Sequence, residues 1–151
     1  MTVLAVAFVS CNSKAVFSPN LQTAAQLIRV SAEGVRDTIT FNDSLQVGDT
    51  VYLGMLCNGF YDYLKKVSAT GDESKVLTSL EWPDSLSYVL ADDSDQEHGC
   101  LSFLPEKVYA IYTTLTYIPV ASGTHKLDFQ ITSAAPESYN LYSGSLVIAV
   151  K

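Results

Sequence analysis

Apolar and polar residues alternate along much of the chain, most regularly in its last third. In the segment THKLDFQIT at 124–132, every second residue from His125 to Ile131 belongs to the less polar side, and the intervening residues are Lys126, Asp128 and Gln130. A period of two is typical of a β-strand with one buried face and one solvent-exposed face. Residues 107–151 as a whole predict three strands joined by two turns.

Runs of similar character recur along the rest of the chain, and turn residues separate them every 8–15 residues or so. The pattern predicts nine or ten strands, among them 2–10, 50–57, 75–80 and 86–90, with no long helix. Spacing of this kind is typical of a two-sheet sandwich or a jelly roll. We therefore expect an all-β fold, a two-sheet antiparallel sandwich that is jelly-roll-like, built as a single domain over 1–151.

Two glycine-containing dipeptides predict tight turns. Glu33-Gly34 lies between two β-like runs and predicts a two-residue hairpin turn, and Asn58-Gly59 is the strongest hairpin signal in the chain. A third glycine, Gly54, interrupts an apolar strand, which indicates a bulge or a close approach of another group to the backbone.

Charge and composition narrow the class of partner. The chain has 9 basic and 16 acidic residues, a net charge of −7, which disfavours binding to nucleic acid or to an anionic membrane. The N-terminus is apolar, but it has no Lys or Arg directly after Met1 and is too short to span a membrane. We expect residues 2–10 to form a buried strand and no targeting segment to be present.

The three cysteines, Cys11, Cys57 and Cys100, are far apart and have no C-x-x-C spacing. An odd number cannot all pair within one chain, so we expect reduced, mostly buried thiols and folding in a reducing cytoplasm. A Cys11–Cys57 or Cys57–Cys100 disulfide remains an alternative.

The acidic run at 92–97 is the one dense cluster of charge in the sequence. Asp93, Asp95 and Glu97 alternate as the first ligands of a calcium loop do, but Gly99 falls one place late and Leu104 occupies the twelfth position, where such a loop has Glu. A solvated surface loop is the alternative that we favour.

Catalytic patterns are weak throughout. His98 and His125 are the two histidines, His125 is in phase with a buried strand face, and no G-x-S-x-G motif accompanies them. We expect no enzyme activity, no metal and no cofactor.

Aromatic residues offer a different kind of site. Tyrosine and tryptophan provide large contact areas with few rotatable bonds, which suits a protein interface or a sugar-binding platform as well as a core. The candidate residues for an interface or a sugar platform are Trp82, Tyr61, Tyr63, Tyr88, Tyr139 and Tyr142.

Three segments give the chain a resemblance to known proteins: GDTVYL at 48–53, SGTHKLDFQI at 122–131 and the C-terminal YSGSLVIAVK. With them the sequence resembles jelly-roll domains of virion proteins, including capsid-decorating proteins and tail-fibre heads of tailed bacteriophages, and heads of the complement and tumour-necrosis-factor type. The resemblance implies a homotrimer or an array on a larger assembly, with the last strand deep in a sheet. It carries over no functional residue.

These observations together predict a non-enzymatic structural virion protein, a phage capsid decoration or head-fibre component that is made in the host cytoplasm. Its expected partners are further copies of itself and other virion proteins such as the major capsid protein. The alternative function is a carbohydrate-binding module or receptor-binding head, which would expose Trp82 together with several tyrosines on one face.

Overall fold

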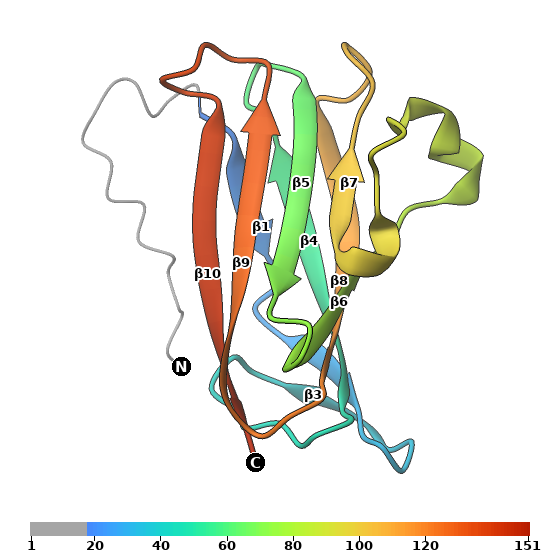
Figure 1. Cartoon of the computed structure of the whole chain (residues 1–151), viewed down its shortest axis with the longest axis vertical. Helices are drawn as coiled ribbons and strands as arrows, with labels where there is room; N and C mark the ends of the chain where they lie inside the picture. The colour runs from blue at the N-terminus through green and yellow to red at the C-terminus, as the bar shows by residue number, and fades with distance from the viewer. Residues whose placement is uncertain (1–17) are drawn as a thin grey trace.

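A computed structural model describes residues 18–151, which fold into two antiparallel β-sheets packed face to face (Figure 1). One sheet has six strands in the order β3-β2-β4-β8-β6, with β1 also paired to β4, and the other has four in the order β10-β9-β5-β7. The all-β, two-sheet antiparallel sandwich is confirmed. The predicted strand at 2–10 lies outside the described residues.

The ten described strands are joined by short connections and two 3₁₀-helices. Their bounds are β1 Asn20–Thr23, β2 Leu27–Val30, β3 Arg36–Ile39, β4 Thr50–Asn58, β5 Leu64–Gly71, β6 Val76–Leu80, η2 Asp84–Val89, η3 Gln96–His98, β7 Cys100–Ser102, β8 Ala110–Pro119, β9 Gly123–Ser133 and β10 Leu141–Val150.

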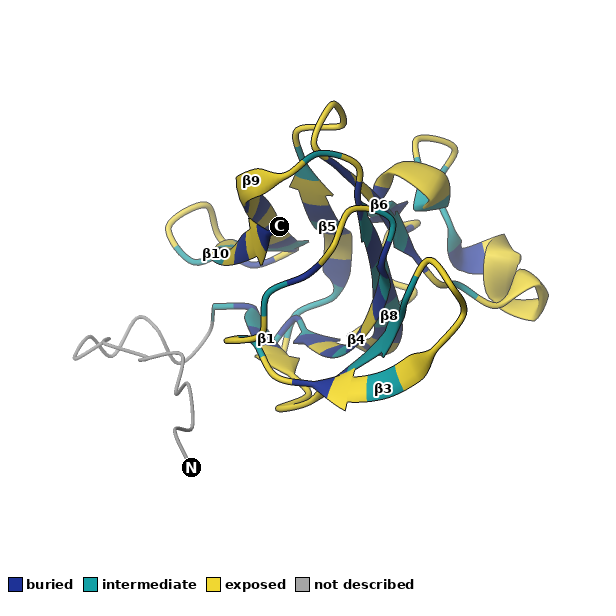
Figure 2. Ribbon diagram, turned by 90° about the horizontal axis from the view of Figure 1, so that it is seen from below, coloured by how far each residue is buried: buried dark blue, intermediate teal, exposed yellow. Residues whose placement is uncertain are grey.

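The core lies between the two sheets and is filled by alternate residues of each long strand. On β9 the predicted alternation is confirmed, because His125, Leu127, Phe129 and Ile131 are all buried. Burying each large apolar side chain contributes roughly 1.5–3 kcal/mol. Figure 2 shows the result as bands of buried and exposed residues that alternate along the ribbons.

The predicted turn at Glu33-Gly34 joins β2 to β3, but it is one residue longer than expected. The Ser31 amide donates to the Val35 carbonyl at 2.8 Å, which leaves three residues in the loop, and Gly34 has a φ of +84°. A left-handed glycine at the end of a three-residue loop is a common way to close a hairpin. The hairpin is therefore confirmed and its two-residue turn type is wrong.

The Asn58-Gly59 hairpin is wrong. β4 belongs to the six-stranded sheet and β5 to the four-stranded sheet, so the chain crosses from one layer to the other at this point. All consecutive strands from β4 to β9 alternate between the sheets in the same way. A hairpin signal reports a local reversal of the chain, and the strand after the turn still pairs wherever its buried face fits best.

Two further predictions are corrected. Residues 86–90, predicted as a strand, lie mostly in η2, which begins directly after Pro83. The last strand is not deep in a sheet, because β10 pairs with β9 alone among the named strands and forms the edge of the four-stranded sheet. Its inward residues are accordingly less well buried toward its start than those of β9.

Gly54 has the close approach that its position predicted. The side chain of Tyr112, on the adjacent strand β8, lies over Gly54, and a β-carbon there would collide with the phenol ring. The outer surface of β4 is therefore covered at this point by a tyrosine, which matters for the character of that sheet face.

Candidate tyrosine-bearing contact site

Three loops meet at one end of the sandwich, the upper end in Figure 1. They are 59–63 between β4 and β5, 103–109 between β7 and β8, and 134–140 between β9 and β10. Backbone hydrogen bonds join them: the Gly59 amide donates to the Tyr109 carbonyl, and the Ala134 amide to the Tyr63 carbonyl, both at 2.8 Å. The loops are thus held to one another as well as to their strands.

Four tyrosines on these loops, Tyr61, Tyr63, Tyr109 and Tyr139, are here called the tyrosine end. The rings of Tyr63 and Tyr109 stack with centroids 4.0 Å apart and planes 22° from parallel. A hydrogen bond between their side chains raises the pKa of Tyr63, and burial adds to the shift. Tyr61 is 79% exposed and meets Phe60 edge to face, with centroids 5.1 Å apart.

The backbone under Tyr61 adopts a conformation that residues with a β-carbon rarely take. Phe60 has a φ of +53° and Tyr61 a φ of +77°, and Glu106 in the adjacent loop has a φ of +58°. Each such residue costs of order 1–3 kcal/mol, so it persists because its surroundings hold it. Here the Asn58 side-chain oxygen accepts from the Phe60 amide at 2.7 Å, which fixes the start of the turn. These contacts fix the backbone from which the Tyr61 side chain projects.

The structure brings together three of the six predicted aromatic residues, Tyr61, Tyr63 and Tyr139. Trp82 is only partly exposed: its ring packs on Phe103 at 5.4 Å, and its indole nitrogen donates to the Leu86 carbonyl at 3.1 Å. Tyr88 is exposed on η2, and Tyr142 is a half-buried residue of the edge strand β10.

The sequence interpretation missed Tyr109, because the strands expected over 107–151 were taken to begin at Lys107. β8 instead begins at Ala110, so Tyr109 belongs to the loop and is half exposed. Pro105 was a usable signal, because a proline and the residues after it are typical of a connection rather than of a strand interior.

The acidic run forms an exposed loop around η3, and its carboxylates do not converge. Asp95 accepts from His98 Nδ1 at 2.8 Å, and this hydrogen bond raises the pKa of His98. The Ser94 hydroxyl donates to the Ser102 carbonyl and so anchors the loop to β7. Within residues 18–151 no group of three or more His, Cys, Asp or Glu side chains is placed to hold a metal ion. The structure therefore does not assemble Asp93, Asp95 and Glu97 into a site.

The remaining reactive side chains are enclosed. Cys57 is completely buried, which raises the pKa of its thiol to about 12, and Cys57 and Cys100 are both free thiols. His125 is buried with its Nε2 2.5 Å from the Ala121 carbonyl, while its Nδ1 has no hydrogen-bond partner among the described residues. A thiol with such a high pKa is a poor nucleophile at neutral pH.

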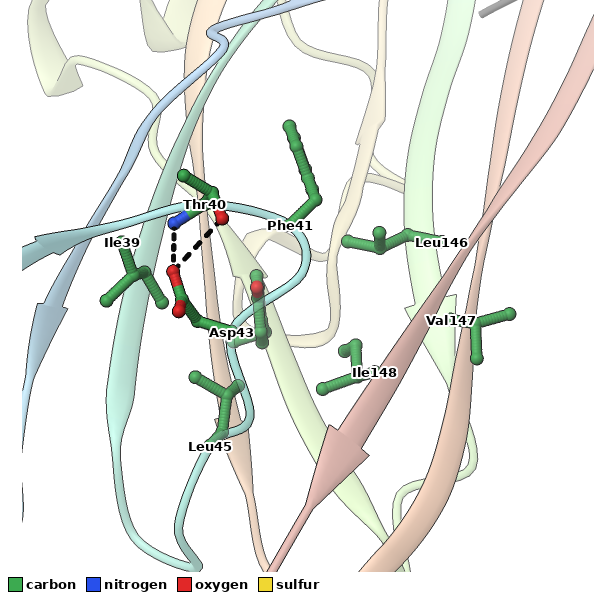
Figure 3. Close-up of a pocket in the computed structure, with 9 residues that line it drawn as sticks. Ile39, Thr40, Phe41, Asp43, Leu45, Leu146, Val147 and Ile148 are labelled. Atoms are coloured by element: carbon green, nitrogen blue, oxygen red, sulfur yellow. Dashed lines mark hydrogen bonds between the residues drawn. The ribbon is translucent and has the colours of Figure 1, made fainter. Parts of the chain in front are cut away.

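A small hollow opens between the end of β3 and the edge strand β10 (Figure 3). Its volume of about 10 Å³ is the space of a single water molecule, too little for an organic ligand. Asp43 closes one side by accepting from the Thr40 amide at 2.7 Å and hydroxyl at 3.0 Å, and these bonds lower the pKa of Asp43. The hollow is a packing gap at the open edge of the sandwich.

A wider depression of about 350 Å³ lies at the start of β9. Its two lysines are already in ion pairs, Lys126 with Asp128 at 2.9 Å and Lys75 with Asp72 at 3.6 Å. Neither lysine is left as an unpaired cation for a ligand, and exposed pairs of this kind contribute little to stability.

Comparison with known proteins adds no relative. No protein-family model matches the sequence, and no curated protein matches it. Of the helices in the described part of the chain, none is long and apolar enough to cross a membrane. What the chain does must therefore be inferred from its own surface.

Proposed function

We propose that this chain is a non-enzymatic structural component of a virion, a phage capsid decoration or head-fibre protein that acts by protein–protein contact. The observation that carries the proposal is the tyrosine end, where the 59–63 loop is hydrogen-bonded to the 103–109 and 134–140 loops and holds the exposed Tyr61 on a strained backbone. The proposal includes the jelly-roll variety of the sandwich, assembly with further copies in the trimer or array that the resemblance implies, and a major capsid protein as partner.

Several physical features of the tyrosine end support a contact role. Tyrosine combines a large apolar ring with a hydroxyl and loses little side-chain entropy on binding, and tyrosines are therefore common at interfaces. Because the 59–63 loop is already held in one conformation, a partner does not have to order it, and this lowers the entropic cost of association. The net charge of −7 favours a protein partner over nucleic acid.

The carbohydrate-binding alternative has lost one of its supports. It required Trp82 to be exposed with several tyrosines on one face, but the ring of Trp82 packs on Phe103 and its nitrogen is bonded to a backbone carbonyl. A sugar platform would now have to consist of tyrosines alone.

The test is whether the chain is a stoichiometric part of gradient-purified virus particles from its source and whether Tyr61 is needed for attachment. Tagged protein, added to particles that have been stripped of it, should bind, and Tyr61→Ala should weaken binding at least about tenfold, as expected for an interface hot spot. Tyr88→Ala is the matched control, since Tyr88 is 71% exposed but carried by η2. Absence of the chain from particles, or binding that both variants leave unchanged, would refute the proposal. A glycan array run in parallel would reveal the carbohydrate alternative.

A further inference from the structure

The outer face of the six-stranded sheet is unusually apolar for a surface that meets solvent. The outward side chains of β4, β6 and β8 include Tyr52, Leu56, Leu77 and Tyr112, all of them exposed. Antiparallel sheets normally cover their solvent side with polar residues. The apolar sheet face, as we call it, comprises Ile28, Val30, Tyr52, Leu56, Leu77, Tyr112 and Ile118.

Strand register places these residues beside one another rather than scattering them. Tyr52 lies opposite Ile28 of β2, Leu56 is opposite Tyr112, and Leu77 of β6 is opposite Ile118. Tyr112 also lies over Gly54, which extends its ring across the surface of β4. The result is three apolar pairs spread across the sheet from β2 to β6, with the hydroxyl-bearing residues Thr114, Thr116 and Ser79 between them.

The opposite face of the molecule shows what an ordinary solvent side looks like in this chain. The outward residues of β9 and β5 include Lys126, Asp128, Gln130 and Lys66, all exposed. By contrast, the outward positions of β1, β2, β4, β6 and β8 hold no charged residue, and the nearest charges lie at the edges of the face, on Arg36 of β3 opposite Val30 and on Glu81 directly after β6. Figure 2 looks along the sandwich and shows the two layers end on.

The absence of charge favours a second copy of this chain as the occupant of the face. Two copies that each carry a charge of −7 repel one another, and this repulsion is weakest where the apposed surfaces are uncharged. A partner recognised through several basic or acidic groups would find charge only at the edges of this face, on Arg36 and Glu81. Homodimer interfaces, in contrast, are apolar, depleted in charge and rich in tyrosine.

The available area is sufficient for such a contact. Nine residues of β4 at a rise of roughly 3.3 Å extend about 30 Å, and four strands spaced about 4.8 Å apart extend about 19 Å. The face thus offers about 600 Å² per copy, and two copies would bury about 1,200 Å² in total, the lower bound for a stable specific interface.

We propose that two copies pack through their apolar sheet faces about a two-fold axis, sheet against sheet with β4 and β8 at the centre. Each copy contributes the same surface, so the contact closes and does not propagate. The inference rests on the proposed contact function, but for the contact between copies it replaces the trimer or array named there with a closed two-fold pair. The tyrosine ends lie at the ends of the sandwiches and remain free for the other partner.

The test is the mass of the purified full chain by sedimentation velocity across about 1–100 μM. We expect a species of twice 16.4 kDa. Tyr52→Glu should raise the dissociation constant at least about 100-fold, because each copy then buries an unpaired carboxylate. Leu77→Glu, at a residue that is 47% exposed, is a second variant with less risk to folding. Val147→Glu, at a 60% exposed apolar residue of β10, is the matched control and should leave the dimer intact.

A wild-type monomer throughout this range, a trimer, or a dimer that Tyr52→Glu and Leu77→Glu both leave unchanged would overturn the inference. Disruption by Val147→Glu alone would also overturn it, by placing the contact on the other sheet. The inference and the proposed function fail separately: a monomer that still binds stripped particles removes the two-fold contact alone, and a dimer that is absent from particles removes the virion role alone.

Discussion

The positive φ of Tyr61 predicts that a glycine variant is more stable than an alanine variant at this position, the reverse of the usual order. In ordinary conformations a glycine is less favourable than an alanine by about 0.5–1 kcal/mol, because glycine loses more entropy on folding. At a φ of +77° the alanine β-carbon itself costs about 1–2 kcal/mol, whereas glycine has no such cost. Tyr61→Gly should therefore be more stable than Tyr61→Ala by about 0.5–1 kcal/mol, although both variants have lost the same ring and the contacts it made.

The comparison site is Tyr88, which is similarly exposed but does not have a positive φ. There the order should be the usual one, with the alanine variant more stable than the glycine variant by about 0.5–1 kcal/mol. Chemical denaturation of the four variants measures both differences, and a gain of about 1 kcal/mol corresponds to a melting temperature about 2–4 °C higher. An alanine variant at Tyr61 that is as stable as the glycine variant would show that the 59–63 loop stores no strain, and the case for a pre-shaped contact site would lose its physical basis.

Three further predictions concern other parts of the fold. Gly34→Ala should lower the folding stability by about 1 kcal/mol, because of its φ of +84° alone. Gly99→Ala should lower it by about 3 kcal/mol, because the added β-carbon also collides with a backbone carbonyl of β5. Thermal denaturation measures both losses, and equal losses would contradict the packing at Gly99. Cys57, with a pKa of about 12, should not react with iodoacetamide at pH 8 until guanidinium unfolds the chain. Peptide mass spectrometry would measure this, and labelling of Cys57 in the native protein would mean that the core is open to the reagent. His98 should titrate above 6.5 by NMR, and Asp95→Asn should bring its pKa back toward that value. Because the folded pKa is raised, the pair stabilises the fold fully below pH 6.5, and its contribution is lost as pH rises through the raised pKa.

Strands could be predicted from the sequence where one face is buried and the other is wet. On β9 the polarity of each residue predicts whether its side chain faces the core or the solvent, and the structure agrees from His125 to Ile131. The energetic reason is local: a shift of one residue would put Leu127 and Phe129 in water and Lys126 in the core. No knowledge of the neighbouring strand is needed to see this.

Strand pairing could not be predicted in the same way, because it depends on contacts between distant segments. Asn58-Gly59 does reverse the chain, but β5 pairs with β9 and β7, whose residues come more than 30 positions later in the sequence. The apolar run at 86–90 looked like a strand, but Pro83 begins a 3₁₀-helix and only Val89 of that helix is buried. The segment therefore lies mostly exposed beside β7, to which Leu90 is joined by a single bridge at Phe103.

The candidate site was only partly predictable, for a related reason. Composition indicated tyrosines as contact residues, and Tyr61, Tyr63 and Tyr139 do meet at one end. Their proximity arises from three loops that are separated along the chain by 25 or more residues and meet because the strands alternate between the sheets. The stacking partner Tyr109 was missed because its role depends on where β8 begins, and element boundaries are the least certain feature of a sequence pattern.

The solvent-facing residues of the two sheets differ in kind, although the core-facing residues of both sheets are alike. Buried and exposed residues alternate along both β8 and β9, and the inward residues of both strands pack in the core between the sheets. Their outward residues differ: β9 carries Lys126 and Asp128, whereas β8 carries Tyr112, Thr114 and Ile118. Because β8 lies between β4 and β6, its outward side chains occupy the middle of a broad face rather than an edge. Tyrosine and isoleucine favour the strand conformation, but so does threonine, which would meet the same requirement and keep these solvent-facing positions polar. Their presence in the middle of a face whose charges lie at its edges supports the proposed contact between two copies of the chain.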